Sequence, residues 1–116
     1  MRVAVTSKGN GMHGQIAEHF GRCPEYILID IENGRIKKTG VVPNPYFNSH
    51  TPGAVPDFMK KNHVDLVITG GIGPMGIQAL NEYGIKVMTG VKGKPSDAVS
   101  DYISGKLTAN ENMCDH

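Results

Sequence analysis

The segment Asp65–Ile77, which reads Asp-Leu-Val-Ile-Thr-Gly-Gly-Ile-Gly-Pro-Met-Gly-Ile, constrains the fold of this 116-residue chain more than any other. Its apolar first half, rich in β-branched residues, stops at two glycines, and an amphipathic segment begins directly after Pro74. This order predicts a buried strand, a tight turn and a helix with proline in its first turn. Because the first turn of a helix presents unpaired N–H groups and a partial positive charge, we predict that an anion binds at this turn.

The remaining patterns supply the other elements of a single domain. We predict strands at residues 2–6, 25–31, 35–42, 65–69 and 85–88, and helices at residues 54–62, 74–83 and 95–104. The triplet Glu32-Asn33-Gly34 is typical of a hairpin turn, whereas residues 7–24 and 43–53 read as loops. This order predicts an α/β sandwich over residues 1–107 with a mixed five-stranded sheet and three helices. We expect the polar tail, residues 108–116, to be flexible.

Composition excludes several classes of function. The formal net charge of +1 comes without a basic block, which argues against a nucleic-acid partner. No apolar stretch approaches the roughly 20 residues that span a bilayer, and the N-terminus turns polar too early for a secretory signal. The two cysteines lie far apart in the sequence, which favours reduced thiols. We therefore expect a cytoplasmic protein with no membrane partner.

The glycine turn also matches the dinucleotide-binding pattern G-x-G-x-x-G at residues 71–76. That function requires an acidic residue about 20 positions later, at the end of the next strand, and none follows residues 85–89 here. The Gly-Lys-Ser/Thr of a phosphate-binding loop is absent as well. The sequence leaves open a purely structural turn, an anion site of another kind, and a binding module for a nucleotide or other phosphorylated small molecule.

Histidines and cysteines are the other chemical resource, since imidazole and thiolate are ligands for zinc, copper, iron and sulfide clusters. No spacing among them is a metal signature by itself. His13 and His50 lie on non-periodic loops after strands, where binding groups concentrate. The candidate metal ligands are His13, Cys23, His50, Cys114 and His116. Cys23 beside Arg22 also suggests a thiol of low pKa, and hence a small cysteine-dependent enzyme as a further alternative.

Five segments together resemble one family. They are Met1-Arg-Val-Ala-Val5, His19-Phe-Gly-Arg-Cys-Pro24, Asn44-Pro45 followed by His50, Gly70-Gly-Ile-Gly-Pro74, and Gly84-Ile-Lys-Val87. In this order they look like the nitrogenase iron–molybdenum cofactor biosynthesis family of small cluster carriers, which includes orange-protein-like relatives. The resemblance implies a ribonuclease-H-like α/β fold, no enzymatic activity, and the binding or delivery of an iron–sulfur or molybdenum-containing cluster. Cluster-assembly or acceptor proteins are the partners that it implies.

The resemblance also carries over to residues. Phe20 and Arg22 match the family's first-loop motif, Asn44 matches the second loop, and His50 corresponds to its loop histidine. The matching turn comprises Gly70, Gly71, Ile72, Gly73 and Pro74. Two features depart from the family pattern, namely Cys23 and the tail sequence Met113-Cys-Asp-His116. The resemblance thus predicts a cofactor site between the first loop, the second loop and the glycine turn.

Overall fold

The computed structural model describes residues 1–47 and 53–107, and it confirms the predicted order of elements. The strands are β1 (Arg2–Ser7), β2 (Glu25–Glu32), β3 (Arg35–Pro43), β4 (Leu66–Ile68) and β5 (Lys86–Met88). The α-helices are α1 (Ala54–Lys61), α2 (Pro74–Glu82) and α3 (Pro95–Ile103). The predicted ends of these elements are correct to within two residues. One element was not predicted, a short 3-10 helix, η1 (Gly11–His13), within the first loop.

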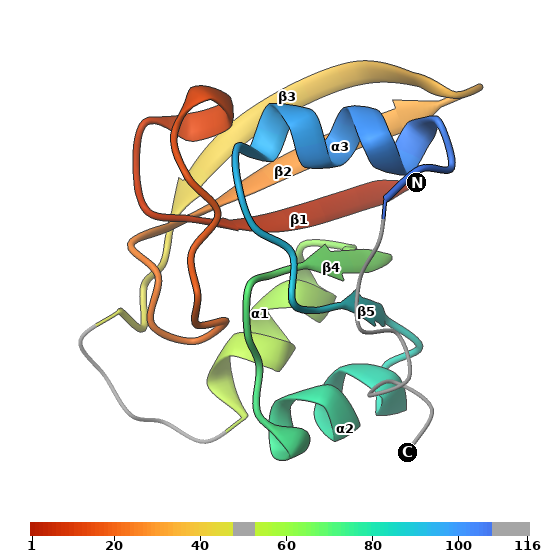
Figure 1. Cartoon of the computed structure of the whole chain (residues 1–116). Helices are drawn as coiled ribbons and strands as arrows, with labels where there is room; N and C mark the ends of the chain where they lie inside the picture. Colours follow the sequence, from red (N-terminus) through yellow and green to blue (C-terminus); the bar gives the residue numbers. More distant parts are fainter. Residues whose placement is uncertain (48–52, 108–116) are drawn as a thin grey trace.

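The five strands form one mixed sheet in the order β3-β2-β1-β4-β5 (Figure 1). Strands β1, β4 and β5 are parallel to one another, whereas β2 runs antiparallel to both β1 and β3. Consequently β3 has the direction of β1, and the carboxyl ends of β1, β3, β4 and β5 lie at one edge. Ser7, Glu25 and Pro43 stand opposite one another at this edge. We call it the carboxyl edge of the sheet.

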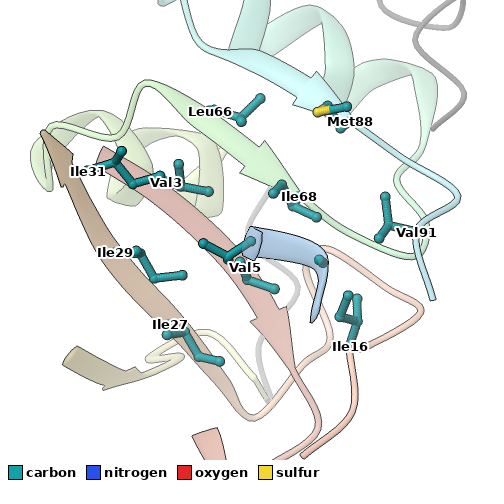
Figure 2. Packing of buried hydrophobic residues seen from close by; sticks show 12 residues of the cluster. Val3, Val5, Ile16, Ile27, Ile29, Ile31, Leu66, Ile68, Met88 and Val91 are labelled. Atoms are coloured by element: carbon teal, nitrogen blue, oxygen red, sulfur yellow. The ribbon is translucent and has the colours of Figure 1, made fainter. Parts of the chain in front are cut away.

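Each face of the sheet carries its own hydrophobic core, because successive side chains of a strand point to opposite faces. On one face Val3 and Val5 of β1 pack against residues of the neighbouring strands (Figure 2), and residues of α3 and η1 complete this core. On the other face Ala4 packs beneath α1 and α2. Helix α1 contributes Val55 and Met59 to this second core, with Phe58 packed against it. The described residues thus form an α/β sandwich, with α3 on one side of the sheet and α1 and α2 on the other (Figure 1).

The turns use the residues that the sequence points to. Asn33 and Gly34 both adopt positive φ angles, 55° and 73°, which is the geometry of a tight hairpin turn. Gly105, which follows the last residue of α3 by two positions, has a φ of 75°. None of the helices in the described ranges is long and apolar enough to cross a membrane.

An ion pair joins β1 and β2 at the end of the sheet opposite the carboxyl edge. The Arg2 Nε lies 2.7 Å from the Asp30 Oδ1, and this contact lowers the pKa of the Asp30 carboxyl group. A lowered pKa stabilises the fold above the pKa of the unfolded chain, and this stabilisation is lost as the pH falls through the folded value. We therefore expect Asp30→Asn to destabilise the protein at pH 7 and to have a smaller effect near pH 3.

Urea unfolding at both pH values measures the two differences. Glu82→Gln serves as the control, because Glu82 is an exposed carboxylate at the end of α2. A difference between wild type and Asp30→Asn that stays constant from pH 7 to pH 3 would contradict the role of this ion pair.

Candidate functional site

The carboxyl edge collects the segments that the sequence marks as functional. The first loop, residues 8–24, follows β1, and the glycine turn, residues 70–73, follows β4 and leads into α2. The second loop begins after β3, at residue 44. Figure 1 shows the first loop beside the carboxyl end of β1, at the side of the molecule where α2 and α3 begin. Segments more than forty residues apart in the sequence therefore meet at one edge.

The first loop and the glycine turn are joined backbone to backbone. The Gly70 N–H donates to the Ala17 carbonyl over 3.0 Å, and the Phe20 N–H donates to the Gly71 carbonyl over 2.9 Å. A Cβ on Gly70 would lie 2.8 Å from the Ala17 oxygen, and one on Gly71 would lie 2.4 Å from the Glu18 oxygen. Glycine is required at both positions because the two backbones are in direct contact. One role of the glycine turn is therefore to let the first loop approach this closely.

Asn44 connects the second loop to the first. It is 6% exposed, and its side-chain amide donates to the carbonyls of Cys23 and Gly21 over 2.9 and 3.3 Å. Its Oδ1 accepts the Tyr46 N–H over 2.9 Å. The polar side-chain atoms of Asn44, which matches the family motif, thus form hydrogen bonds with the backbones of both loops. Asn44 therefore holds the two loops together.

The outer half of the glycine turn is open. Gly73 precedes α2 with an extended backbone, no side chain caps this helix, and Pro74 is at its first position. A Cβ on Gly73 would meet no atom within 4 Å. The Ile72 and Gly73 N–H groups have no hydrogen-bond partner among the described residues. Free N–H groups at an uncapped helix start are the features that bind an anion.

Phe20 and Ile72 give this part of the site its apolar support. Phe20 is 5% exposed and lies in the core beneath α1 and α2, with its ring 6.1 Å from that of Tyr26. Ile72 is half-buried and packs against the same core. Phe20 therefore supports the turn from below, whereas Arg22, two residues later, is exposed.

Basic side chains are exposed along the carboxyl edge and outnumber the carboxylates by one charge among the described residues, with Glu18, Glu25 and Asp97 counted against them. Lys8 follows β1, Arg22 lies in the first loop, and Lys92 and Lys94 lie between β5 and α3. The carboxylates opposing them include Glu18, whose Oε1 lies 2.9 Å from the Lys8 Nζ, and Asp97 in the first turn of α3. The hydrogen bond from Lys8 lowers the pKa of Glu18, and the charges of His19 and Lys92 add to this effect. Such an edge attracts an anionic ligand.

The sequence did not indicate three polar residues that hold this edge. Thr6 and Thr69 are fully buried, and their hydroxyl oxygens lie 3.0 Å apart. The carboxylate of Glu25 accepts the Gly11 N–H over 3.0 Å and the Ser7 hydroxyl over 2.7 Å, and thereby fastens η1. One sequence signal could have pointed to the two threonines. Each is a polar residue at the end of an apolar run, and the two runs were predicted to form parallel strands.

The candidate metal ligands are not gathered into one cluster in the described residues. His13 is exposed and ends η1 at the carboxyl edge. His50, Cys114 and His116 lie outside the described residues. Among residues 1–47 and 53–107, no group of three or more His, Cys, Asp or Glu residues could hold a metal ion.

Cys23 requires a correction. Its side chain is 1% exposed and lies in the core, where its Sγ donates to the Phe20 carbonyl over 3.6 Å. Burial raises the pKa of this thiol, so the expectation of a reactive thiol of low pKa beside Arg22 is wrong. The neighbouring arginine suggested a thiolate, but the backbone turns the cysteine inward and Arg22 outward.

Because Cys23 is buried, we expect its thiol to react slowly with alkylating agents. In a Cys114→Ser variant, which leaves Cys23 as the single cysteine, alkylation by iodoacetamide should be at least about a hundredfold slower in the folded protein than in urea, because the thiolate form is excluded from the core. Mass spectrometry over time measures both rates. Equal rates in the two conditions would show that Cys23 is accessible.

Sequence comparison relates nearly the whole chain to known proteins. The family model described as dinitrogenase iron-molybdenum cofactor matches residues 1–105. The protein MJ0580 of Methanocaldococcus jannaschii is 28% identical over 109 residues, which cover 92% of this chain and 89% of that protein.

Solved structures show the same fold. The crystal structure of PH0822 has a TM-score of 0.87 and 36% identity, and the match covers 97% of this chain and 99% of that chain. The apo form of the orange protein from Desulfovibrio gigas has a TM-score of 0.82 and 28% identity, with 93% and 91% covered. Since the family match extends over the sheet, both described loops and the glycine turn, this chain belongs to the dinitrogenase iron–molybdenum cofactor family.

Proposed function

We propose that this protein is a non-enzymatic cytoplasmic carrier or scaffold for an iron–sulfur or molybdenum-containing metal–sulfur cluster, or for a precursor of one. The cargo would bind at the carboxyl edge, against residues 70–74 and the first loop. The observation that carries the proposal is the pair of free N–H groups at Ile72 and Gly73, at the uncapped start of α2. Membership in a family named for the iron–molybdenum cofactor supports this choice of cargo.

The carboxyl edge suits a metal–sulfide cluster in two respects, which are its charge and its small number of strong metal ligands. Metal–sulfide clusters are commonly anionic, and oriented amides, a helix N-terminus and basic side chains all favour an anion. Lys8, Arg22, Lys92 and Lys94 supply the positive charge. A carrier must also release its cargo to an assembly or acceptor protein. Several weak N–H contacts with few direct metal ligands suit this requirement better than a closed set of thiolates.

His13 is our candidate for a direct ligand within the described residues. It is exposed at the end of η1, and the Glu25 carboxylate fixes the start of η1 through the Gly11 N–H. A neutral imidazole is a common metal ligand, and it can leave a metal without unfolding the site. His50, Cys114 and His116 remain proposed ligands. Cys23 would have to leave the core to bind metal, and we assign its side chain to packing.

Anaerobic purification followed by metal and sulfide analysis tests the proposal. Protein as isolated, or after incubation with ferrous iron and sulfide or with tetrathiomolybdate, should retain metal and sulfide through gel filtration and absorb visible light. Molybdate and ATP are the controls, because they are anions without sulfide. Failure to retain metal under all of these conditions would sink the proposal, and thermal stabilisation by ATP alone would favour the alternative of a phosphorylated ligand.

A pair of histidine variants locates the site. His13→Ala should weaken retention by at least about tenfold, the scale on which even supporting residues of metal sites act. His63→Ala is the matched control, since His63 is also exposed but lies near Arg2 and Asp30, at the opposite end of the sheet. Equal losses in both variants would remove His13 from the site.

A further inference from the structure

We propose that Thr6 and Thr69 are positioning residues for the glycine turn, and that their buried hydroxyl groups set the direction in which the turn presents its free N–H groups. Neither threonine belongs to the segments that match the family motifs. This inference rests on the proposed function, because the N–H groups in question are those assigned to the cargo.

The two threonines form a bridge between β1 and β4. Val5 of β1 pairs with Ile68, the last residue of β4, so Thr6 of β1 lies beside Thr69, which follows β4 directly. Both are 0% exposed, and their Oγ1 atoms lie 3.0 Å apart. The Thr6 Oγ1 lies 3.0 Å from the Ala17 carbonyl oxygen, and the Thr69 Oγ1 lies 3.2 Å from the Gly71 carbonyl oxygen. The pair therefore contacts both the first loop and the glycine turn.

The direction of the turn follows from the contacts of one peptide group. The Gly71 carbonyl accepts the Phe20 N–H over 2.9 Å and the Thr69 hydroxyl over 3.2 Å, so it points inward. In a trans peptide the C=O and the following N–H point in opposite directions, and there is no cis bond among the described residues. The Ile72 N–H is consequently directed away from Thr69 and Phe20.

The same threonine determines which amides are free. The Gly71 N–H lies 3.4 Å from the Thr69 Oγ1 and points to it, so this donor is used inside the turn. The first donors left without a partner in the described residues are Ile72 and Gly73. Thr69 thus holds both polar groups of Gly71, and Thr6 holds Thr69 in place.

Packing alone does not explain threonine at these positions. Their neighbours on the same face of the sheet are Ala4 and Val67, which are fully buried and apolar. Valine has the shape of threonine and would fill the same space, whereas a buried hydroxyl group is unfavourable unless it is hydrogen-bonded. Donation from the Thr6 hydroxyl to the Thr69 Oγ1, and from the Thr69 hydroxyl to the Gly71 carbonyl, supplies that bonding and gives both hydroxyl groups a role in the turn.

Amide hydrogen exchange in the protein without cargo tests the positioning directly. Thr69→Val should raise the exchange rates of the Phe20 and Gly70 amides, which join the loop to the turn, by about tenfold, the effect of losing one hydrogen bond. Thr69→Ser should restore the wild-type rates to within about threefold, because it returns the hydroxyl group. Thr89→Val is the matched control, since Thr89 is also buried after a strand but bonds neither the first loop nor the glycine turn in the described structure.

Titration with tetrathiomolybdate then tests the link to cargo. We expect Thr69→Val to weaken binding about tenfold and Thr6→Val to weaken it less, with Thr69→Ser close to wild type. Raised exchange with unchanged binding would make the threonines merely structural and overturn the inference, as would unchanged exchange in Thr69→Val. If wild-type protein binds no metal sulfide, the proposed function fails, and the exchange rates alone decide whether Thr69 orients the turn.

Discussion

Gly71→Ala is expected to lower the free energy of unfolding by about 3 kcal/mol, the upper range for inserting atoms into a closely packed site. The new Cβ would lie 2.4 Å from the Glu18 carbonyl oxygen, which is backbone and has no rotamer to change. To accommodate it, the first loop must move away from the turn, and the bond from the Phe20 N–H to the Gly71 carbonyl then lengthens. Urea unfolding followed by far-UV circular dichroism measures the change.

Gly73→Ala is the matched control two residues away. Gly73 has a φ of −77°, which any residue adopts, and open space where the Cβ would be. Its unfolding free energy should stay within about 0.5 kcal/mol of wild type, as for most surface substitutions. If Gly71→Ala were as mild as Gly73→Ala, the close contact between turn and first loop would be wrong.

Met59→Ala is expected to cost about 2–5 kcal/mol, because it leaves a cavity in the core beneath α1 and α2. Met59 is 0% exposed and lies in the cluster that includes Ala4, Val67 and Leu80. This core also contains Phe20, so loss of packing there should reach the support beneath the glycine turn. Thermal and urea unfolding both measure the loss.

Met75→Ala removes the same atoms from the surface. Met75 is 80% exposed in the first turn of α2, so its truncation should change the unfolding free energy by no more than about 0.5 kcal/mol. A similar loss in both variants would mean that Met59 is not packed as the structure has it.

Most of the fold could be predicted because each element has its own local signal. The apolar runs before Gly34 and Gly70 mark β2 and β4, and proline opens α2 and α3. Helix η1 was missed because the first loop is rich in glycine and has no periodicity. Its start depends on positive φ angles at Asn10 and Gly11, which no pattern of apolar residues reveals.

The meeting of the first loop and the glycine turn was predictable, whereas their inner contacts were not. Parallel strands bring their carboxyl ends to one edge, so the meeting of the first loop and the glycine turn follows from the order of elements. The pairing of Thr6 with Thr69 depends on the register of strands that are 63 residues apart, which the sequence does not specify. The burial of Cys23 likewise depends on how the first loop folds back onto the core.

Amide chemical-shift mapping during an anaerobic titration with tetrathiomolybdate tests the central claim most directly, because it reports both binding and location. We predict saturable shifts that are largest at the Ile72 and Gly73 amides and at His13, with little change at Arg2 and His63. Saturable shifts confined to the Arg2 and His63 end of the sheet, or no shifts at all, would contradict a cluster site at the carboxyl edge.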